Sequence, residues 1–428
     1  MADVTNSETV DAVPEVEFGE RSQNADTRIR IAVVTQGFHI GGGVPAVSRW
    51  IRKGLDADGR FDVDVFDLAT RWSDEFSRCL LQPRTWFRRS LRGRVHGHES
   101  AWGANAVELE FMRYMPRLEL SRQLASYDLI QVVGGSPALA FAVLRSGVPV
   151  VVQAATTAKW ERGSRFGSMP LRRRLWSKFM TVIVARIEVA TLRRVDAVVV
   201  ENRAMQAHAE RVGAIDVNFA PPGVNIDRFS PSTEGLCRSG YLLSVCRLGE
   251  PRKGLDRLIR AYKKLLTIRP DAPPLILAGK GELSPAVVSL IEEFDLESRV
   301  QIRADVDPAD LPELYRGAST FLQTSHEEGL GISVIEAMAS GLPVIATETA
   351  GSQVTVRPGI TGWIISQRHE EELLDRFAQL IVQVLENDGP GFAINARDVA
   401  LSEFSSDAAL ARFLTVYRHI LNAADLRL

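Results

Sequence analysis

The strongest constraint on the fold is the order in which strand patterns, a glycine loop and helical patterns follow one another. Residues 28–35 read Arg-Ile-Arg-Ile-Ala-Val-Val-Thr, which is typical of a buried β-strand. A loop at 36–43 follows and ends in three glycines, and a helical pattern over 45–55 then leads to an alternating strand at 61–66. This order predicts the start of a doubly wound α/β domain.

The same rhythm continues to about residue 220 and then starts again. Further strands of the first half are predicted at 129–133, 148–152, 197–200 and 216–220. Its helices are predicted at 138–144, in a long amphipathic stretch that ends near 194, and after Asn202, which is suited to cap a helix. The second half repeats the pattern, with strands at 241–245, 275–278, 300–303, 320–323 and 344–346 and helices at 254–267, 284–294, 310–316 and 332–340.

A break between the two runs divides the chain. Pro221-Pro222-Gly223 interrupts the pattern, and the boundary is expected within 226–238. The chain is therefore predicted to hold two Rossmann-like domains that face a cleft, because ligands of such folds bind beyond the strand ends and between domains. The predicted parts are 1–27, 28–230, 231–405 and 406–428. The last part is a helix that is expected to pack back toward the N-terminal domain.

Charge, cysteines and apolar runs exclude several classes of protein. Residues 1–27 hold seven acidic residues against Arg21 and no apolar block, which predicts a disordered acidic tail rather than a secretory signal. The formal net charge of -2 argues against a dedicated nucleic-acid binder. Three distant cysteines indicate neither a disulfide framework nor a zinc site. The longest apolar stretch, 129–155, is broken by Gly134-Gly135-Ser136-Pro137, whereas a membrane helix needs ~20 apolar residues. A cytoplasmic protein is expected.

The clearest chemical signal lies at 325–346, which reads Ser-His-Glu-Glu-Gly-Leu-Gly-Ile-Ser-Val-Ile-Glu-Ala-Met-Ala-Ser-Gly-Leu-Pro-Val-Ile-Ala. Glu328 stands in the loop, and Glu336 follows eight residues later inside the predicted helix. A glycine turn at a helix start presents free backbone N–H groups and the positive end of the helix dipole, which suit a phosphate. Carboxylates on either side can accept hydrogen bonds from sugar or ribose hydroxyls. The structural alternative is an ordinary pair of surface carboxylates.

This segment resembles the E-X7-E motif of retaining nucleotide-sugar glycosyltransferases with the GT-B fold, the large family-4 group. The resemblance extends over about residues 28–425. It includes further segments in the order that the family has them: the Gly42-Gly43 loop, Pro222–Phe229, Ser244–Leu255, Leu277–Gly281 and Gly359–Gly362.

The resemblance implies a role for each matching position. The N-terminal domain would bind the acceptor, and the C-terminal domain would bind a UDP-, GDP- or ADP-sugar donor. Arg247 and Lys253 would hold the donor diphosphate, Glu328 would bind the donor sugar near its anomeric carbon, and Glu336 would bind the ribose hydroxyls. Arg247, Lys253 and Glu328 would be the catalytic positions. Backbone groups would complete the donor site at Gly42, Gly43, Gly329, Leu330, Gly331 and Ile332.

The resemblance also implies a retaining hexosyltransferase that needs neither metal nor another cofactor. Cationic side chains and helix N-termini would stabilise the departing nucleoside diphosphate while the anomeric carbon gains oxocarbenium character. Two Asp-x-Asp strings, at 62–64 and 305–307, are interpreted as structural, since the first lies in a strand and the second precedes a proline turn.

A position beside the expected donor-sugar site departs from the family pattern. Many members carry a histidine that contacts the donor sugar just after the strand that corresponds to 148–152, and here Ala155 stands at that place. Gln153, Thr156 or Thr157 would then supply a replacement contact, or the loop is merely polar. Because of this departure, a non-catalytic nucleotide-sugar-binding protein remains an alternative to a transferase. A sugar epimerase of the same fold is a second alternative.

Two basic segments are candidates for contact with an anionic membrane or with a lipid-linked acceptor. One spans Arg84 to Arg94 and holds Trp86 and Phe87, and the other spans 159–174 and is followed by Trp176. Basic residues beside interfacial aromatics suit peripheral binding to anionic lipids. A solvated arginine-rich face explains the same residues. The acceptor is expected to be a glycan, a lipid-linked sugar or a small molecule, in cell-envelope polysaccharide or glycolipid biosynthesis.

Overall fold

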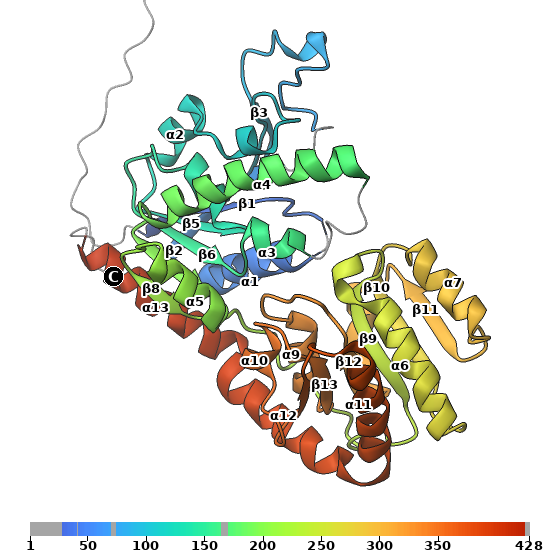
Figure 1. Ribbon diagram of the computed structural model, residues 1–428. Coiled ribbons are helices and arrows are strands. Elements are labelled where there is room, and N and C mark those ends of the chain that lie inside the picture. The colour runs from blue at the N-terminus through green and yellow to red at the C-terminus, as the bar shows by residue number, and fades with distance from the viewer. Residues whose placement is uncertain (1–27, 41, 70–73, 164–169, 424–428) are drawn as a thin grey trace, which may run out of the picture.

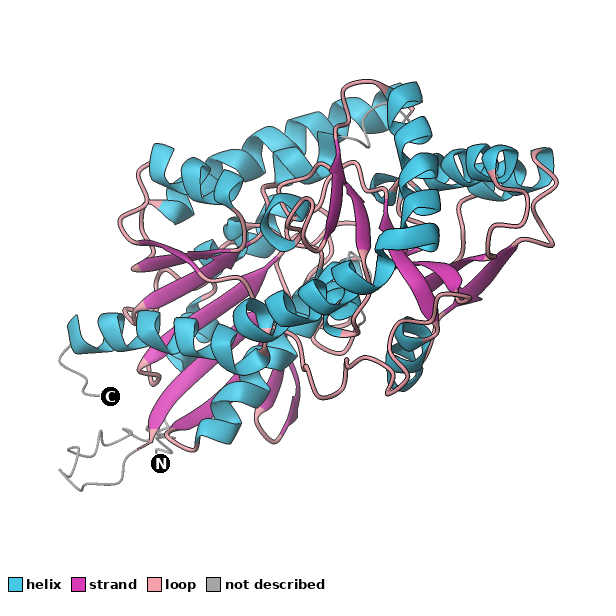
Figure 2. Cartoon of the chain, turned by 90° about the horizontal axis from the view of Figure 1, so that it is seen from below, coloured by secondary structure: helices cyan, strands magenta, loops and turns pink. Residues whose placement is uncertain are grey.

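The computed structural model describes residues 28–40, 42–69, 74–163 and 170–423. The predicted acidic tail at 1–27 and Gly41, the first of the three consecutive glycines in the loop, lie outside these residues. Two α/β domains make up the described chain (Figure 1). Helices flank both sheets, as Figure 2 shows, and this confirms the predicted doubly wound architecture.

The N-terminal sheet runs in the order β3-β4-β2-β1-β5-β6-β7-β8. Its neighbouring strands are parallel except β3 and β4, which pair in antiparallel register at one edge. The strands are β1 (Ile29–Thr35), β2 (Phe61–Leu68), β3 (Arg92–His96), β4 (Glu99–Trp102), β5 (Leu129–Gly134), β6 (Val150–Ala154), β7 (Ala197–Val200) and β8 (Val217–Phe219). The carboxyl ends of β1, β5, β6 and β7 therefore meet along one edge of the sheet.

Helices of the N-terminal domain connect these strands. Asn202 caps α5 as predicted, since its side chain accepts a hydrogen bond from the backbone N–H of Met205 at 2.8 Å. The helix predicted at 138–144 is instead a short 3₁₀-helix that begins with Pro137. The helices are α1 (Gly43–Asp58), η1 (Pro83–Thr85), η2 (Glu110–Tyr114), α2 (Leu118–Leu124), η3 (Pro137–Ala142), α3 (Ala158–Gly163), α4 (Leu171–Leu192) and α5 (Arg203–Arg211).

The C-terminal sheet is parallel and runs in the order β11-β10-β9-β12-β13-β14. Its strands are β9 (Tyr241–Arg247), β10 (Leu275–Lys280), β11 (Val300–Ala304), β12 (Ala318–Gln323), β13 (Val344–Thr347) and β14 (Gly362–Ile365). Its helices are η5 (Pro251–Lys253), α6 (Leu255–Ile268), α7 (Pro285–Glu293), η6 (Pro308–Asp310), α8 (Leu311–Arg316), α9 (Ile332–Ala339), α10 (Ser352–Thr355), α11 (Glu370–Gln383), η7 (Val384–Asp388) and α12 (Gly389–Phe404). Because β9 and β12 are neighbours, the loops that follow them are brought side by side.

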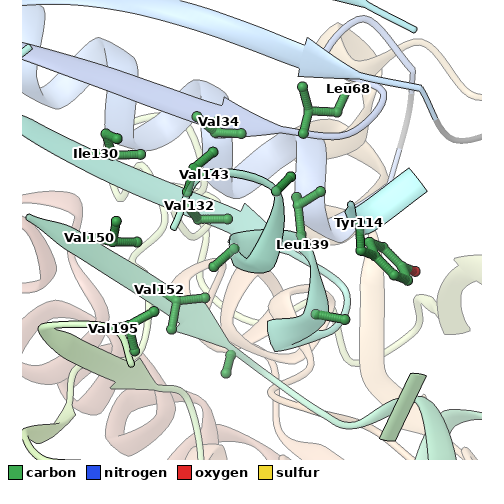
Figure 3. Packing of buried hydrophobic residues seen from close by; sticks show 14 of the residues in the cluster. Val34, Leu68, Tyr114, Ile130, Val132, Leu139, Val143, Val150, Val152 and Val195 are labelled. Atoms are coloured by element: carbon green, nitrogen blue, oxygen red, sulfur yellow. The ribbon is translucent and has the colours of Figure 1, made fainter. Parts of the chain in front are cut away.

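The core of the N-terminal domain is built by valines on the central strands. Val132 on β5 and Val152 on β6 are fully buried and pack beside Leu139 of η3 (Figure 3). Strands that are covered on both faces carry near-continuous apolar runs, which is why their positions were predictable from the sequence. Each such side chain contributes roughly 1.5–3 kcal/mol relative to an exposed one.

The chain crosses between the domains twice. After α12 it returns as α13 (Ser406–Ala423), which lies against α1 and β7 of the N-terminal domain (Figure 1). Phe413 and Tyr417 are fully buried there, and the Tyr417 hydroxyl donates to Gln131 Oε1 on β5 at 2.7 Å. The C-terminal helix thus completes the apolar layer on one face of the N-terminal sheet.

None of the helices within the described residues is long and apolar enough to cross a membrane.

Candidate active site

The loops that follow β9 and β12 in the C-terminal domain meet at the carboxyl ends of these two strands. The backbone N–H of His326 donates to the carbonyl oxygen of Arg252 at 2.8 Å, so the loop after β12 is bonded to η5. Gly254 follows η5 with φ of 62°, and a Cβ there would lie 2.2 Å from the carbonyl oxygen of Thr324. Only glycine permits this close approach. The packing explains why Lys-Gly stands at 253–254.

The first predicted pair of site residues is in direct contact. Lys253 Nζ donates to Glu328 Oε2, and both side chains are only 12% exposed. Burial opposes ionisation of Glu328, but the positive charges of Lys253 and Arg252 outweigh it and lower the pKa of this carboxyl. Glu328 is therefore an ionised carboxylate at neutral pH.

Arg252 is a site residue that the sequence analysis missed. Its guanidinium is buried and donates to Glu250 Oε1 at 2.8 Å and to the carbonyl oxygen of Glu327 at 3.2 Å. It lies 3.8 Å from Glu328 Oε1. Burial disfavours its charged form, yet the surrounding carboxylates raise the pKa of Arg252. Arg252 thus holds the backbone of the 325–331 loop through the carbonyl oxygen of Glu327. Both Arg252 and Lys253 lie close to the Glu328 carboxylate.

Glu336 lies inside α9 and is partly buried. Its Oε2 accepts a hydrogen bond from the hydroxyl of Tyr315 at 2.8 Å, and Tyr315 is itself fully buried. Burial raises the pKa of Glu336 to about 7, although the Tyr315 hydrogen bond and the charge of Arg228 both lower it. Arg228 belongs to the 222–229 segment, so two separately predicted segments meet here. Tyr315 was not singled out, because it lies 21 residues away from Glu336.

Arg247 differs from Lys253 in its surroundings. It ends β9, its side chain is 49% exposed, and its Nε lies 3.1 Å from Glu250 Oε2. An exposed guanidinium beside one carboxylate is able to turn toward a ligand.

The loop glycines shape the start of α9. Gly331 caps this helix with φ of 86°, a backbone conformation that side chains rarely adopt. Leu330 is buried in the domain core, so only its backbone is available to a ligand. Ile332, the first residue of α9, packs against apolar residues of the N-terminal domain.

The N-terminal domain meets this loop through the ends of β6 and β7. The side-chain amide of Asn202 donates to the carbonyl oxygens of Ala155 and Gly329, at 2.8 and 2.7 Å. A Cβ on Gly329 would lie only 3.0 Å from the Cβ of Ala155. Ala155 therefore contacts the E-X7-E loop at the place where a histidine was considered.

All three proposed replacement residues already have hydrogen-bond partners within the protein. The Thr156 hydroxyl donates to Glu327 Oε1 across the domain boundary at 3.0 Å. The amide of Gln153 donates to Glu201 Oε1 at 2.6 Å, and both residues are buried. Thr157 is buried as well, and its hydroxyl accepts from the backbone N–H of Trp160 at 3.3 Å.

Glu201 is a second residue that the sequence analysis missed. Burial raises its pKa to about 7; the Gln153 hydrogen bond lowers this pKa, and the negative charge of Glu328 raises it. An acidic residue directly after the apolar strand Ala197–Val200 is the signal that was available, because such positions lie at the ligand-binding edge of a parallel sheet.

The glycine loop of the N-terminal domain follows β1. Gly42 caps α1 with φ of 138°, and Gly43 is the first residue of that helix. A Cβ on Gly43 would meet no atom within 4 Å, so the space around it is open.

The Asp-x-Asp strings have structural partners. Asp64 accepts hydrogen bonds from Tyr127 and from His98, and Asp307 caps η6 by accepting from the backbone N–H of Ala309 at 2.8 Å. Within the described part of the chain no cluster of three or more His, Cys, Asp or Glu residues is placed to hold a metal ion.

Comparison with known proteins shows which family the C-terminal domain resembles. Residues 238–387, which span the C-terminal sheet and most of its helices, match the family Glycosyl transferases group 1. A relative from Mycobacterium tuberculosis, the GDP-mannose-dependent alpha-(1-6)-phosphatidylinositol monomannoside mannosyltransferase, is 30% identical over 189 residues, which cover 40% of this chain and 48% of that protein. The chain spans less than half the length of the curated relatives it matches.

Solved structures match over both domains. Sucrose-phosphate synthase from Thermosynechococcus elongatus has a TM-score of 0.68 and 20% sequence identity, over 92% of this chain and all of that chain. HepE from Anabaena, in complex with UDP-glucose, has a TM-score of 0.64 and 18% identity, over 91% of this chain and all of that one. At these identities the likeness shows the fold. The chain therefore has the GT-B fold, and its residues 238–387 match the family Glycosyl transferases group 1.

Proposed function

We propose that this protein is a retaining hexosyltransferase that moves a sugar from a nucleoside-diphosphate sugar to an acceptor hydroxyl. The observation that carries the proposal is the position of Glu328. This ionised carboxylate is held by Lys253 and Arg252 at the contact between the two domains. Burying these charges costs stability. A carboxylate that is fixed between cations at a contact between domains is therefore expected to bind a ligand.

The donor would lie along the carboxyl edge of the C-terminal sheet. Lys253 and Arg247 would bind the diphosphate, the latter by turning its half-exposed guanidinium away from Glu250. The backbone N–H groups at Gly329–Ile332, at the start of α9, would add dipolar stabilisation. Glu336 would accept hydrogen bonds from the ribose hydroxyls, and Gly42 and Gly43 would face the diphosphate from the other domain. HepE in complex with UDP-glucose and the GDP-mannose-dependent relative support a UDP- or GDP-sugar, and ADP-sugars belong to the same class.

The chemical step needs charge stabilisation more than a nucleophile from the protein. The bond between the anomeric carbon and the β-phosphate oxygen breaks, and the leaving diphosphate gains negative charge beside Lys253 and Arg247. The acceptor oxygen bonds to the anomeric carbon on the same face, and its proton passes to the departing phosphate oxygen. Glu328 would hold the sugar hydroxyls and favour the positive charge that develops on the ring. We propose that no metal ion takes part.

The acceptor is the least constrained part of the proposal. We propose a glycan, a lipid-linked sugar or a small molecule, in cell-envelope polysaccharide or glycolipid biosynthesis, which is in keeping with a relative named for a phosphatidylinositol mannoside substrate. The protein would act in the cytoplasm, peripherally on the inner face of the membrane.

Release of nucleoside diphosphate from UDP-, GDP- and ADP-sugars tests the proposal. We expect release from one donor, lost in Glu336→Ala and retained in Glu372→Ala, because Glu372 is an exposed residue on α11. Donor binding without release in any condition would favour the non-catalytic alternative. With an acceptor in hand, NMR of the anomeric proton tests retention, and an inverted product would refute the proposed step.

A further inference from the structure

The helix α4 carries apolar side chains on two opposite faces. Met180, Val184 and Ile187 point into the N-terminal domain, where the first two are fully or almost fully buried. Leu171, Leu175, Phe179 and Val182 repeat at intervals of four, four and three residues, so they form one stripe along the helix. These four side chains are 70, 59, 56 and 51% exposed, and Trp176 beside them is 52% exposed. A stripe of this size has no partner within the described part of the chain.

Basic side chains border this stripe on both sides. On a helical wheel Arg172 falls beyond one edge of the stripe, and Arg174 and Lys178 fall beyond the other. Glu188 is the only acidic residue of α4, and it is buried against Ser136 and Ala158. The outward face of α4 therefore combines aliphatic and aromatic side chains with positive charge and no negative charge.

A groove continues the stripe toward the C-terminal half of α4. It is open to solvent, has a volume of about 650 Å³, and is lined by Thr181, Val182, Ala185 and Val189 together with the cations Lys159, Lys178 and Arg186. Val182 belongs to both the stripe and the groove. A groove that combines apolar and cationic side chains suits a hydrocarbon chain that ends in an anionic group.

The charge pattern decides among the possible occupants. A second copy of this chain would bring the same cations against themselves, which opposes a symmetric contact across this face. An anionic bilayer instead offers hydrocarbon to the stripe and negative headgroups to the flanking arginines and lysines. α4 lies on the side of the N-terminal domain that faces away from α13 (Figure 1).

We propose that the outward face of α4 docks this protein on an anionic lipid bilayer, with Leu175, Phe179 and Val182 inserted at the headgroup boundary and an acyl chain in the adjoining groove. The proposal rests on the peripheral membrane placement in the proposed function and assigns it to one surface. It selects α4 over the segment Arg84–Arg94, whose Trp86 and Phe87 are also exposed, at 53 and 85%.

Docking through α4 would bring a lipid-anchored acceptor close to the donor site. The β6–α3 loop that precedes the groove contains Thr156, which is bonded to Glu327 of the E-X7-E loop. A lipid-anchored acceptor whose tail lies in the groove would need to extend only along α3 to reach the cleft. The bilayer would thus present acceptors at the mouth of the site.

Sedimentation with vesicles tests the proposal on the full chain. The vesicles are phosphatidylcholine alone, or phosphatidylcholine mixed with phosphatidylglycerol. We expect binding only to the mixed vesicles and loss of that binding in high salt. Leu175→Ser/Phe179→Ser should weaken the binding at least tenfold, and Arg172→Gln/Arg174→Gln about 25-fold, since each cation near the surface contributes about fivefold. Ile215→Ser is the matched control, because Ile215 is an exposed apolar residue outside α4, at 81%.

Each result has a defined meaning. No binding to mixed vesicles, or equal binding by the α4 variants and the parent protein, would overturn the proposal. Loss of binding in Phe87→Ser but not in the α4 variants would assign the contact to the other segment and also overturn it. A dimer in solution that only the Leu175→Ser/Phe179→Ser variant disrupts would identify a second copy as the occupant. Donor release without vesicles should be unchanged in every α4 variant; if release is absent while vesicle binding is as expected, the proposed transferase function fails and the docking surface stands.

Discussion

The side-chain amide of Asn202 donates a hydrogen bond to the carbonyl oxygen of Gly329 at 2.7 Å, and this bond joins the two domains at the E-X7-E loop. Asn202 also caps α5, since its Oδ1 accepts from the backbone N–H of Met205. One buried side chain thus links a helix of the N-terminal domain to the loop that carries Glu328. We therefore expect the position of this loop to depend on how the two domains meet.

Asn202→Ser should separate the two tasks of this residue. Serine caps a helix about as well as asparagine does, so α5 should keep its stability. The bond to Gly329 is lost, and an unpaired buried carbonyl costs roughly 1–3 kcal/mol in the closed form. We expect the kcat/KM of donor release to fall about tenfold or more, with a larger radius of gyration in small-angle scattering. Unchanged scattering and unchanged donor release would show that the bond does not control closure.

Gly329→Ala should push the domains apart at the same contact. The new Cβ would lie 3.0 Å from the Cβ of Ala155 and 3.2 Å from its carbonyl oxygen, which is tighter than ordinary packing. We expect a several-fold loss of donor release with little change in thermal stability. Ala155→Gly in the same chain removes one of the two atoms involved and should restore part of the activity. Failure of this second change to restore any activity would locate the effect elsewhere in the loop.

The ion pair between Lys253 and Glu328 should show strong coupling. Lys253→Met leaves a buried carboxylate with Arg252 alone, and Glu328→Gln removes the carboxylate partner of Lys253, while Arg252 keeps Glu250 and Glu327. Each change should cost about 2–4 kcal/mol in the free energy of unfolding, and the double variant should cost clearly less than the sum. Denaturant unfolding measures these values. Lys264→Met is the control, because its pairs with Glu371 and Asp375 are at the surface and are each worth under about 1 kcal/mol. Additive losses at Lys253 and Glu328 would contradict the pairing.

Glu201 should make the stability of the protein depend on pH. Burial raises its pKa from 4.5 to about 7, so the folded protein holds this proton more tightly than the unfolded chain does. Glu201 contributes about 3 kcal/mol to the free energy of unfolding below about pH 4.5. This contribution falls as the pH rises to about 7 and is lost above it. Glu201→Gln should flatten this part of the profile and stabilise the protein at pH 8. An unchanged slope between pH 5 and 7 would exclude Glu201 as its source.

Glu336 should make donor binding depend on pH in the opposite direction. Its pKa of about 7 means that the carboxylate, which we propose accepts the ribose hydroxyls, is only partly formed at neutral pH. Donor affinity should therefore rise with pH. The rise is up to about tenfold per pH unit below pH 7, and the affinity levels off above pH 7. Calorimetric titration of the nucleotide at pH 6 and pH 8 checks this. Glu336→Gln should bind weakly and without this pH dependence, and an equal dependence in the variant would assign it to another group.

Most strands that bury the core were predictable, and so were the edge strands β8 and β11, whereas β3, β4 and β14 were not predicted. The central strands carry continuous apolar runs because helices cover both of their faces, and the positions predicted for them agree with β1, β5 and β7 within two residues. β3 and β4 lie at the sheet edge, and β3 is mostly exposed and rich in arginine, so it has no such pattern. The helix α11 was not predicted, although its sequence indicates a helix: three glutamates open it and buried residues follow at helical spacing.

The site shows the same division between local and distant information. Glu328, Glu336 and Lys253 stand in recognisable local strings, and Lys253 and Glu328 do meet in the fold. Asn202 could not be found in this way, because it lies 127 residues away from Gly329 and the contact depends on how the domains face one another. Arg252 is adjacent to Lys253, but spacing alone does not tell which of two neighbouring cations will be buried. Partners of motif residues therefore needed the tertiary structure.

The two crossings between the domains lie side by side. The outgoing and returning chains are bonded where they cross: the N–H of Val224 donates to the carbonyl oxygen of Phe404, and the N–H of Ser406 to that of Val224, both at 2.9 Å. Gly223 packs against the same place, since a Cβ there would lie 2.5 Å from the carbonyl oxygen of Ser405. Because of this close approach, a side chain at position 223 would separate the two chain segments, so the connection between the domains itself depends on a glycine.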